Sequence, residues 1–137
     1  MMDYKVHIGK DSMFNTPPVF AVYTSMLTLE WLKGLGGIEA IEKENFKKSR
    51  LMYSEIDLNP LFKGFAATAD RSTMNATFSL TDDKLKDTFD GMWKEAGING
   101  LNGHRSVGGY RASMYNALPL GSVEALVEVM SELERKA

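Results

Sequence analysis

The chain has 137 residues, the length of one ordinary domain, of which 44% are hydrophobic and 25% are charged. This is the balance of a globular protein and argues against disorder. The formal net charge of −2 excludes a strongly basic nucleic-acid-binding module, and the absence of cysteine excludes disulfides, thiolate metal sites and cysteine nucleophiles. The sequence shows neither the apolar run of a secretory signal nor a membrane-spanning segment. We therefore expect a cytoplasmic protein that binds no nucleic acid and no membrane.

A helix is predicted to begin at Thr16, because a hydroxyl that can cap is followed by two prolines, which a first helical turn tolerates. Residues 19–32 are apolar on nearly every face, and Gly34, Gly36 and Gly37 end the helix. A helix that is hydrophobic all round is normally buried on all sides. It is either the central core helix or, as we favour, a helix that packs against something absent from this chain.

A second helix is predicted over residues 38–56. Its charged residues have the i,i+4 spacing of a solvated helix face and do not indicate a site. These residues are Glu39, Glu42, Lys43, Glu44, Lys47 and Lys48. Apolar and polar residues then alternate over residues 74–80, which predicts a half-buried strand. Residues 65–69 are predicted as its hairpin partner and residues 70–72 as the turn.

A third helix is predicted to be capped by Thr81 and to stop at Gly97. Its apolar face carries Leu85, Phe89, Met92, Trp93 and Ala96. Residues 110–116 are predicted as another strand, and Ser122 as the cap of a final helix. That helix has an apolar face of Val123, Leu126, Val127, Met130 and Leu133. This order of elements indicates an α+β fold, in which helices cover a small, mostly antiparallel sheet.

The most informative segment is residues 103–113, which carry His104, Arg105 and Arg111. No aspartate or glutamate occurs between Ala96 and Val123. Arginine offers a planar set of donors suited to carboxylate or phosphate, and the glycines of this segment let the backbone approach a ligand. The segment therefore predicts an anion site, unless the arginines pair with acids that are distant in sequence.

Asn15 and Thr16 precede the first helix, where a hydroxyl and unpaired backbone N–H groups can bind an anion. Taken alone, the pair is better interpreted as ordinary helix capping. The two histidines, His7 and His104, are far apart in sequence, and the acidic residues lack the spacing of metal ligands. We therefore expect no metal site.

Four segments together resemble the phosphoserine aminotransferases, a family of class V, fold-type-I enzymes that depend on pyridoxal 5'-phosphate. The first is Ser-Met-Phe-Asn-Thr-Pro-Pro at residues 12–18, and the second is Trp-Leu-Lys at residues 31–33 with the following glycine pair. The third is Arg-Ser-Thr-Met-Asn at residues 71–75. The fourth begins Gly-His-Arg-Ser-Val-Gly-Gly-Tyr-Arg at residue 103 and runs to residue 117. Their order and spacing match the C-terminal part of these enzymes.

The resemblance implies two parts in the chain. Residues 1–33 resemble the end of the large cofactor-binding domain with the helix leading out of it, and residues 34–137 resemble the small C-terminal domain. None of the lysines lies in a context resembling the lysine that forms the Schiff base with the cofactor. The resemblance therefore implies no catalytic residue here, and we expect the chain alone to be inactive.

The resemblance also assigns roles to single residues. Asn15 and Thr16 match the pair that contacts the cofactor phosphate across the interface of a homodimer. His104 and Arg105 match the residues that bind the substrate phosphate, and Arg111 matches the arginine that holds the α-carboxylate. The implied reaction of serine biosynthesis transfers an amino group between phosphoserine and glutamate, by way of 3-phosphohydroxypyruvate and 2-oxoglutarate.

A second hypothesis of a different class remains open. The chain would then be a free-standing, non-catalytic module that binds a phosphorylated or carboxylated metabolite, or an assembly domain. Titration of the chain with phosphoserine, read by its melting temperature, distinguishes the two hypotheses. Tight binding favours the module, because a partial enzyme site lacks some of its ligand contacts.

Overall fold

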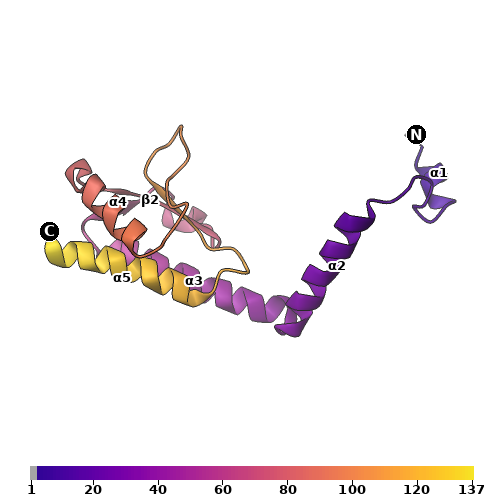
Figure 1. The fold of residues 1–137 in the computed structure, drawn as a ribbon, viewed down its shortest axis with the longest axis horizontal. Helices are drawn as coiled ribbons and strands as arrows, with labels where there is room; N and C mark the ends of the chain where they lie inside the picture. Colours follow the sequence, from indigo (N-terminus) through magenta and orange to yellow (C-terminus); the bar gives the residue numbers. More distant parts are fainter. Residues whose placement is uncertain (1–2) are drawn as a thin grey trace. The chain divides into compact units, whose positions relative to one another are not determined.

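The computed structural model describes residues 3–137 and divides into two compact units, one reaching to Ile38 and the other running from Glu39 to Ala137 (Figure 1). The first unit holds a short helix that the sequence did not predict, α1 (Tyr4–Ile8), and the longer helix α2 (Val19–Gly34). The Asp3 carboxylate caps α1 by accepting a hydrogen bond from the backbone N–H of Lys5 at 2.9 Å. No helix within the described residues has both the length and the apolar character needed to span a membrane.

Helix α2 begins at Val19, two residues later than a helix capped by Thr16 would begin. Pro18 is the residue before the first turn, and no side chain caps the helix there, so the prediction of Thr16 as cap is wrong. A capping side chain has to sit directly before the first turn, and the two prolines move that position beyond Thr16. The predicted end is confirmed, since α2 stops at Gly34 and the next two glycines have positive φ.

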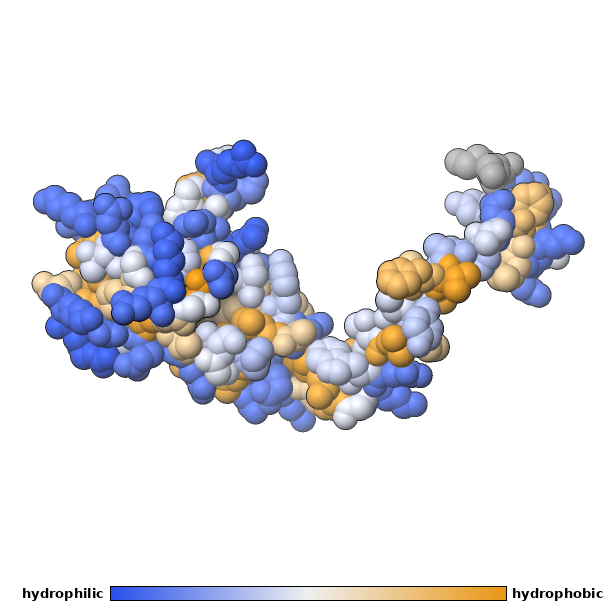
Figure 2. All heavy atoms as spheres, in the orientation of Figure 1, coloured by the Kyte–Doolittle hydropathy of each residue, from blue (hydrophilic) through white to orange (hydrophobic). Residues whose placement is uncertain are grey.

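Helix α2 exposes its apolar side chains, as Figure 2 shows by the hydrophobic residues along it. No residue of this fully described helix is buried, and Phe20 is 80% exposed. The interpretation of α2 as a central core helix is therefore wrong. The exposed apolar surface fits the favoured alternative, a helix whose packing partner is absent from this chain.

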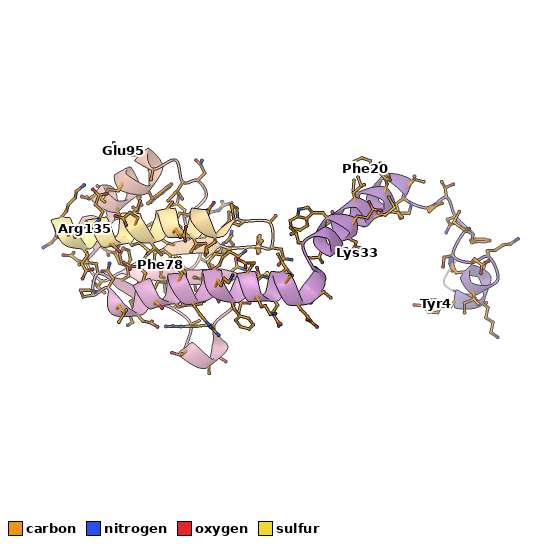
Figure 3. All side chains as sticks on the ribbon, turned by 90° about the horizontal axis from the view of Figure 1, so that it is seen from below. Tyr4, Phe20, Lys33, Phe78, Glu95 and Arg135 are labelled. Atoms are coloured by element: carbon orange, nitrogen blue, oxygen red, sulfur yellow. The ribbon has the colours of Figure 1, made fainter. Side chains whose placement is uncertain are left out.

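The second unit is an α+β fold in two layers, which confirms the predicted class. Its antiparallel sheet has the order β1 (Phe62–Gly64), β2 (Asn75–Leu80), β3 (Tyr110–Ser113). Helices α3 (Gly37–Leu58) and α5 (Leu120–Lys136) run side by side, with α4 (Lys86–Glu95) next to α5 (Figures 1 and 3). Two single 3₁₀ turns, Thr68–Asp70 and Asp83–Leu85, lie in the connections.

The core lies between the helices and one face of the sheet. The alternation predicted for β2 is confirmed, because Ala76, Phe78 and Leu80 are buried and the residues between them are only partly so. The Phe62 ring lies edge-on to Phe78 and to Phe89 of α4, with centroids 5.8 and 5.2 Å apart. The predicted apolar faces of α4 and α5 supply the other side of this core.

Two predictions about the sheet are wrong. The partner of β2 is residues 62–64 and not residues 65–69, because the core takes the Phe62 side chain opposite Leu80. Beyond Gly64 only the Phe65 N–H still donates to the sheet, to the Thr77 carbonyl oxygen at 3.1 Å. Strand β3 ends at Ser113, three residues before the predicted end, and the chain then turns toward α5.

The predicted caps Thr81 and Ser122 are also wrong. The Thr81 hydroxyl donates instead to the Pro60 carbonyl oxygen at 3.0 Å, and the Asp82 carboxylate caps the turn that leads into α4. Ser122 lies inside the first turn of α5, which begins after Pro119 without a side-chain cap. The predicted stop of α4 is confirmed, since Gly97 has a φ of +76°.

One charged residue of the second helix is misplaced by the sequence pattern. Lys48 was predicted on a solvated face, but its side chain is only 1% exposed and faces the core side of α3. Its neighbour Lys47 does lie in solvent, where it pairs with Glu44. Backbone carbonyl oxygens of residues 114–118 accept hydrogen bonds from the buried Lys48 ammonium group.

Candidate substrate-binding site

Arg111 sits on β3 with its side chain exposed and its two neighbours, Tyr110 and Ala112, buried. This alternation sends Arg111 to the face of the sheet opposite the core. Arg111 lies directly across from Thr77 of β2, and its backbone N–H donates to the Leu101 carbonyl oxygen at 2.7 Å. Its backbone is thus held from both sides of β3, while the guanidinium group remains accessible.

The loop before β3 carries His104 and Arg105 and is closed by its own backbone. The N–H groups of Val107 and Gly108 both donate to the His104 carbonyl oxygen, at 2.9 and 2.8 Å. The His104 Nδ1 atom lies 2.7 Å from the Ser106 hydroxyl. The Ser106 N–H also donates to this ring nitrogen, at 3.3 Å. These contacts make a compact turn whose side chains are exposed.

Glycine is required at both ends of this loop. The Gly103 N–H donates to the Gly109 carbonyl oxygen at 2.9 Å, and a Cβ atom at Gly103 would collide with the Gly108 carbonyl. Gly109 has a φ of +62°, and a Cβ atom there would lie 2.6 Å from the Phe78 carbonyl oxygen. The loop can therefore close against β2 only with glycine at these positions.

Neither Arg105 nor Arg111 forms an ion pair with any residue that the structure describes. The alternative that these arginines pair with distant acids is therefore wrong for residues 3–137. Two unneutralised guanidinium groups and one histidine lie within eight residues of chain, in a segment without acids. Such a donor set suits a ligand with more than one anionic group.

The first residue of β3 is anchored to α4. The Tyr110 hydroxyl donates to the Asp90 carboxylate at 2.9 Å, and the same carboxylate accepts from Trp93 at 3.1 Å and pairs with Lys86. Burial and the bond to Asp90 raise the pKa of the Tyr110 hydroxyl. Burial alone would raise the pKa of Asp90, but the hydrogen bonds from Lys86, Tyr110 and Trp93 outweigh it and hold the pKa below its usual value.

Asn15 and Thr16 lie in the first unit, exposed and directly before α2. Within the described chain neither side chain forms a hydrogen bond with another residue. The prediction that they are merely capping residues is therefore not met, since α2 has no side-chain cap. An amide and a hydroxyl beside an uncapped helix start are donors of the kind that hold a phosphate group.

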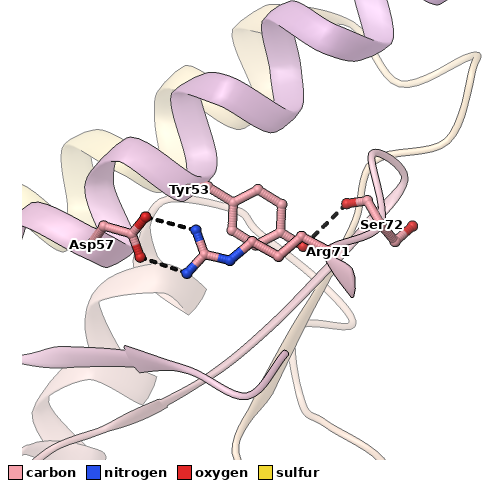
Figure 4. Close-up of polar contacts among 4 residues, drawn as sticks. All are labelled: Tyr53, Asp57, Arg71 and Ser72. Carbon is pink, nitrogen blue, oxygen red and sulfur yellow. Dashed lines mark hydrogen bonds and ion pairs between the residues drawn. The ribbon is translucent and has the colours of Figure 1, made fainter. Parts of the chain in front are cut away.

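A further anchor joins the segment after β1 to α3 (Figure 4). Its residue Arg71 begins the third of the four motifs, but no role was predicted for it from the sequence. The Arg71 guanidinium binds the Asp57 carboxylate with two hydrogen bonds, at 2.6 and 2.7 Å, and lies 4.6 Å over the Tyr53 ring. The Tyr53 hydroxyl is 3.1 Å from the carbonyl oxygens of both Ser72 and Asn75. The hydrogen bonds from Arg71 hold the pKa of Asp57 below its usual value. The i,i+4 spacing of Tyr53 and Asp57 places both on one face of α3, and this was the signal in the sequence that could have indicated the anchor.

A cleft of about 360 Å³ lies beside β3, on the side where Leu101 pairs with Arg111. Its walls include Arg111 and buried apolar residues such as Leu101, Met114 and Leu126. Among the described residues no group of three or more histidines, cysteines or acids lies close enough together to hold a metal ion.

Comparison with solved structures places this arrangement in a known context. A phosphoserine aminotransferase studied for radiation damage of its Schiff base superposes on 98% of this chain with a TM-score of 0.88 and 46% sequence identity. The PLP-bound phosphoserine aminotransferase from Trichomonas vaginalis superposes on 95% of it with a TM-score of 0.81 and 36% identity. In both cases the chain covers 38% of the solved protein.

Sequence comparison agrees. The phosphoserine aminotransferase of Flavobacterium psychrophilum is 65% identical over 136 residues, which are 99% of this chain and 38% of that enzyme. The chain thus spans about 38% of the length of the curated relative that it matches, and the resemblance seen in its motifs is confirmed. Residues 1–126 match the model of the class V aminotransferases. The chain belongs to the class V aminotransferase family.

Proposed function

We propose that this chain is the substrate-binding part of a phosphoserine aminotransferase, which transfers an amino group between phosphoserine and 2-oxoglutarate in serine biosynthesis. One observation carries the proposal. Arg105 and Arg111 present guanidinium groups without ion pairs among the described residues, on the loop and strand that also carry His104, in a chain 65% identical to a phosphoserine aminotransferase. Phosphoserine carries both a phosphate and a carboxylate, which matches donors of this kind at two places.

Arg111 would hold the α-carboxylate of every substrate. A guanidinium group can bind a carboxylate with two parallel hydrogen bonds, which fixes the orientation of the ligand as well as its position. The hydrogen bond from the Arg111 N–H to Leu101 and the pairing with Thr77 keep its backbone in place. This rigidity supports a role in aligning the reacting end of the amino acid.

His104 and Arg105 would hold the phosphate of phosphoserine or of 3-phosphohydroxypyruvate. These contacts lie away from the reacting atoms, so they select the phosphorylated substrate through binding energy. Glutamate and 2-oxoglutarate carry a side-chain carboxylate in place of the phosphate. Because a carboxylate has the smaller charge, these two substrates should depend on His104 and Arg105 less. The closed loop around the His104 carbonyl supports such a fixed phosphate site.

Pyridoxal 5'-phosphate, when bound, supplies the electron sink for the reaction. Asn15 and Thr16 would hold its phosphate across the interface of a homodimer, and their free amide and hydroxyl fit that group. We further propose that residues 1–33 belong to the end of the cofactor-binding domain and the helix leading out of it, and residues 34–137 to the small domain. No lysine of the chain is assigned to the cofactor, so the 137 residues alone would be inactive.

The test compares the protein at the length that its own gene encodes with the 137-residue chain. With added pyridoxal 5'-phosphate, the former should transfer the amino group of phosphoserine to 2-oxoglutarate and the latter should not. In the active protein Arg111→Met should lower kcat/KM for phosphoserine and glutamate alike, by a factor of a hundred or more, as expected on losing a charged two-bond contact. An inactive gene-length protein that binds phosphoserine tightly would overturn the proposal in favour of a binding module.

A further inference from the structure

Lys48 is the most deeply buried charged residue that the structure describes, with 1% of its side chain exposed. It lies in the middle of α3 on the face that also buries Asn45, Ser49 and Met52. No described carboxylate forms an ion pair with it. A buried ammonium group without a counter-ion destabilises a fold unless its hydrogen atoms are bound.

Three backbone carbonyl oxygens bind the Lys48 ammonium group. They belong to Met114, Tyr115 and Leu118, at 3.2, 2.8 and 3.0 Å from Nζ. An ammonium group has three hydrogen atoms, so its donor capacity is fully used. Burial lowers the pKa of Lys48, and the charge of Glu44 opposes that shift.

All three carbonyls lie in one segment, residues 114–118, which we name the β3–α5 link. The link follows directly after β3, and the Met114 N–H at its start donates to the Met74 carbonyl oxygen at 2.7 Å. Asn45, one turn before Lys48, donates from its side-chain amide to the Asn116 side chain at 2.8 Å. Helix α3 therefore forms hydrogen bonds with both the backbone and a side chain of the link.

The first of these contacts, at Met114, lies three residues beyond Arg111 in the chain. The start of β3 is held by Tyr110 and Asp90, and its end is held by Lys48 through the link. An apolar side chain of similar volume could fill the core at position 48 but could not gather three carbonyls, and buried polar groups often specify one arrangement at some cost in stability. Lys48 thus binds the backbone of the segment through which the chain leaves the sheet after β3.

We propose that Lys48 is a positioning residue for Arg111. By fixing the link it fixes the end of β3, and with it the place of the Arg111 guanidinium group. This inference rests on the proposed role of Arg111 in holding the substrate carboxylate. A displacement of about 1 Å at a substrate-holding group can lower the rate by a factor of about a hundred.

The test uses the protein at its gene-encoded length and measures KM and kcat for phosphoserine and glutamate together with the melting temperature. Lys48→Met, which removes the three donors at similar volume, should raise KM for both substrates by roughly tenfold or more. Lys48→Arg restores donors and should recover part of the loss. Asn45→Ala, which releases Asn116 only, should change KM in the same direction by less. The matched control is Ile56→Ala, a buried position of α3 about two turns beyond Lys48, whose apolar side chain donates no hydrogen bond to the link.

A merely structural lysine gives a different pattern. Lys48→Met and Ile56→Ala would then lower the melting temperature and leave KM for both substrates unchanged, which overturns the inference. If Lys48→Met fails to fold, Asn45→Ala and Lys48→Arg decide in its place, and unchanged KM values in both overturn it. Arg111→Met separates the two claims. Unchanged KM in that variant overturns the role of Arg111 and the inference with it, whereas raised KM in Arg111→Met but not in the Lys48 and Asn45 variants overturns only the positioning.

Discussion

The Tyr110 hydroxyl donates to the Asp90 carboxylate across 2.9 Å, which joins the strand that carries Arg111 to helix α4. The contact is enclosed by rings, since Tyr110 stacks on Phe78 and lies edge-on to Phe89. Because the Asp90 carboxylate also accepts hydrogen bonds from Lys86 and Trp93, it keeps these two partners when the Tyr110 hydroxyl is removed. The pair is thus a place where one donor can be removed without leaving a buried charge alone.

Tyr110→Phe should lower the free energy of unfolding by about 1.5–3 kcal/mol, the range for a hydrogen bond to a charged group. The ring contacts with Phe78 and Phe89 are kept, so the loss reports the hydroxyl alone. Urea denaturation measures it, with Tyr4→Phe at an exposed position as the matched control. Equal stability of the Tyr110 variant and the control would show that the bond to Asp90 does not anchor β3.

Gly109→Ala should destabilise the second unit by more than about 1 kcal/mol, because alanine is strained at a φ of +62° and its Cβ would meet the Phe78 carbonyl. Gly91→Ala is the matched control. Gly91 lies inside α4 with no neighbouring atom where a Cβ would be, so alanine there should stabilise by about 0.5–1 kcal/mol. Thermal unfolding of the two variants should give shifts of opposite sign, and a stabilising Gly109→Ala would contradict the loop geometry.

The Arg71–Asp57 pair should make stability depend on pH in acid. The pKa of Asp57 is lowered in the folded state, so its contribution is fully present above the unfolded pKa of about 4 and is lost as pH falls through the lower folded value. Because the Asp57 carboxylate is half-exposed, we expect no more than about 1 kcal/mol. Unfolding of Asp57→Asn and of the chain should therefore differ at pH 6 and converge below pH 3.

Asp70→Asn serves as the control for that measurement, because the Asp70 side chain is exposed and forms no ion pair among the described residues. It should show no such convergence. A difference between Asp57→Asn and the unchanged chain that stays constant from pH 6 to pH 3 would mean that Arg71 does not hold the carboxylate in its charged form.

The elements that depend on local pattern were predictable from the sequence. The alternation around Phe78 identified β2, and glycine identified the ends of α2 and α4. Strand β1 was misplaced, because a strand of three residues is defined by its pairing with residues 78–80 and carries no periodicity of its own. The caps were misassigned because the Thr81 hydroxyl donates to the Pro60 carbonyl oxygen and Ser122 lies inside the first turn of α5.

In the site, too, features that depend on local sequence were predictable and contacts between distant residues were not. The lack of acids around Arg105 and Arg111 predicted cationic groups without local partners, and the described structure adds that no distant acid pairs with them. Lys48 could not be recognised, because beside Glu44 and Lys47 it has the spacing of a solvated helix face. Its partners are backbone carbonyls 66–70 residues further along the chain. Every residue has a backbone carbonyl, so the sequence does not indicate which of them bind Lys48.

The most direct test of the account is the selectivity of Arg105→Gln in the protein at its gene-encoded length. Loss of a charged contact to phosphate should lower kcat/KM for phosphoserine by roughly ten- to a hundredfold. The loss for glutamate, whose side-chain carboxylate carries a smaller charge than a phosphate, should be clearly smaller. The melting temperature should not change, because Arg105 is exposed and pairs with no described residue. Equal losses for both substrates, or no loss for phosphoserine, would contradict the assignment of this loop as the phosphate site.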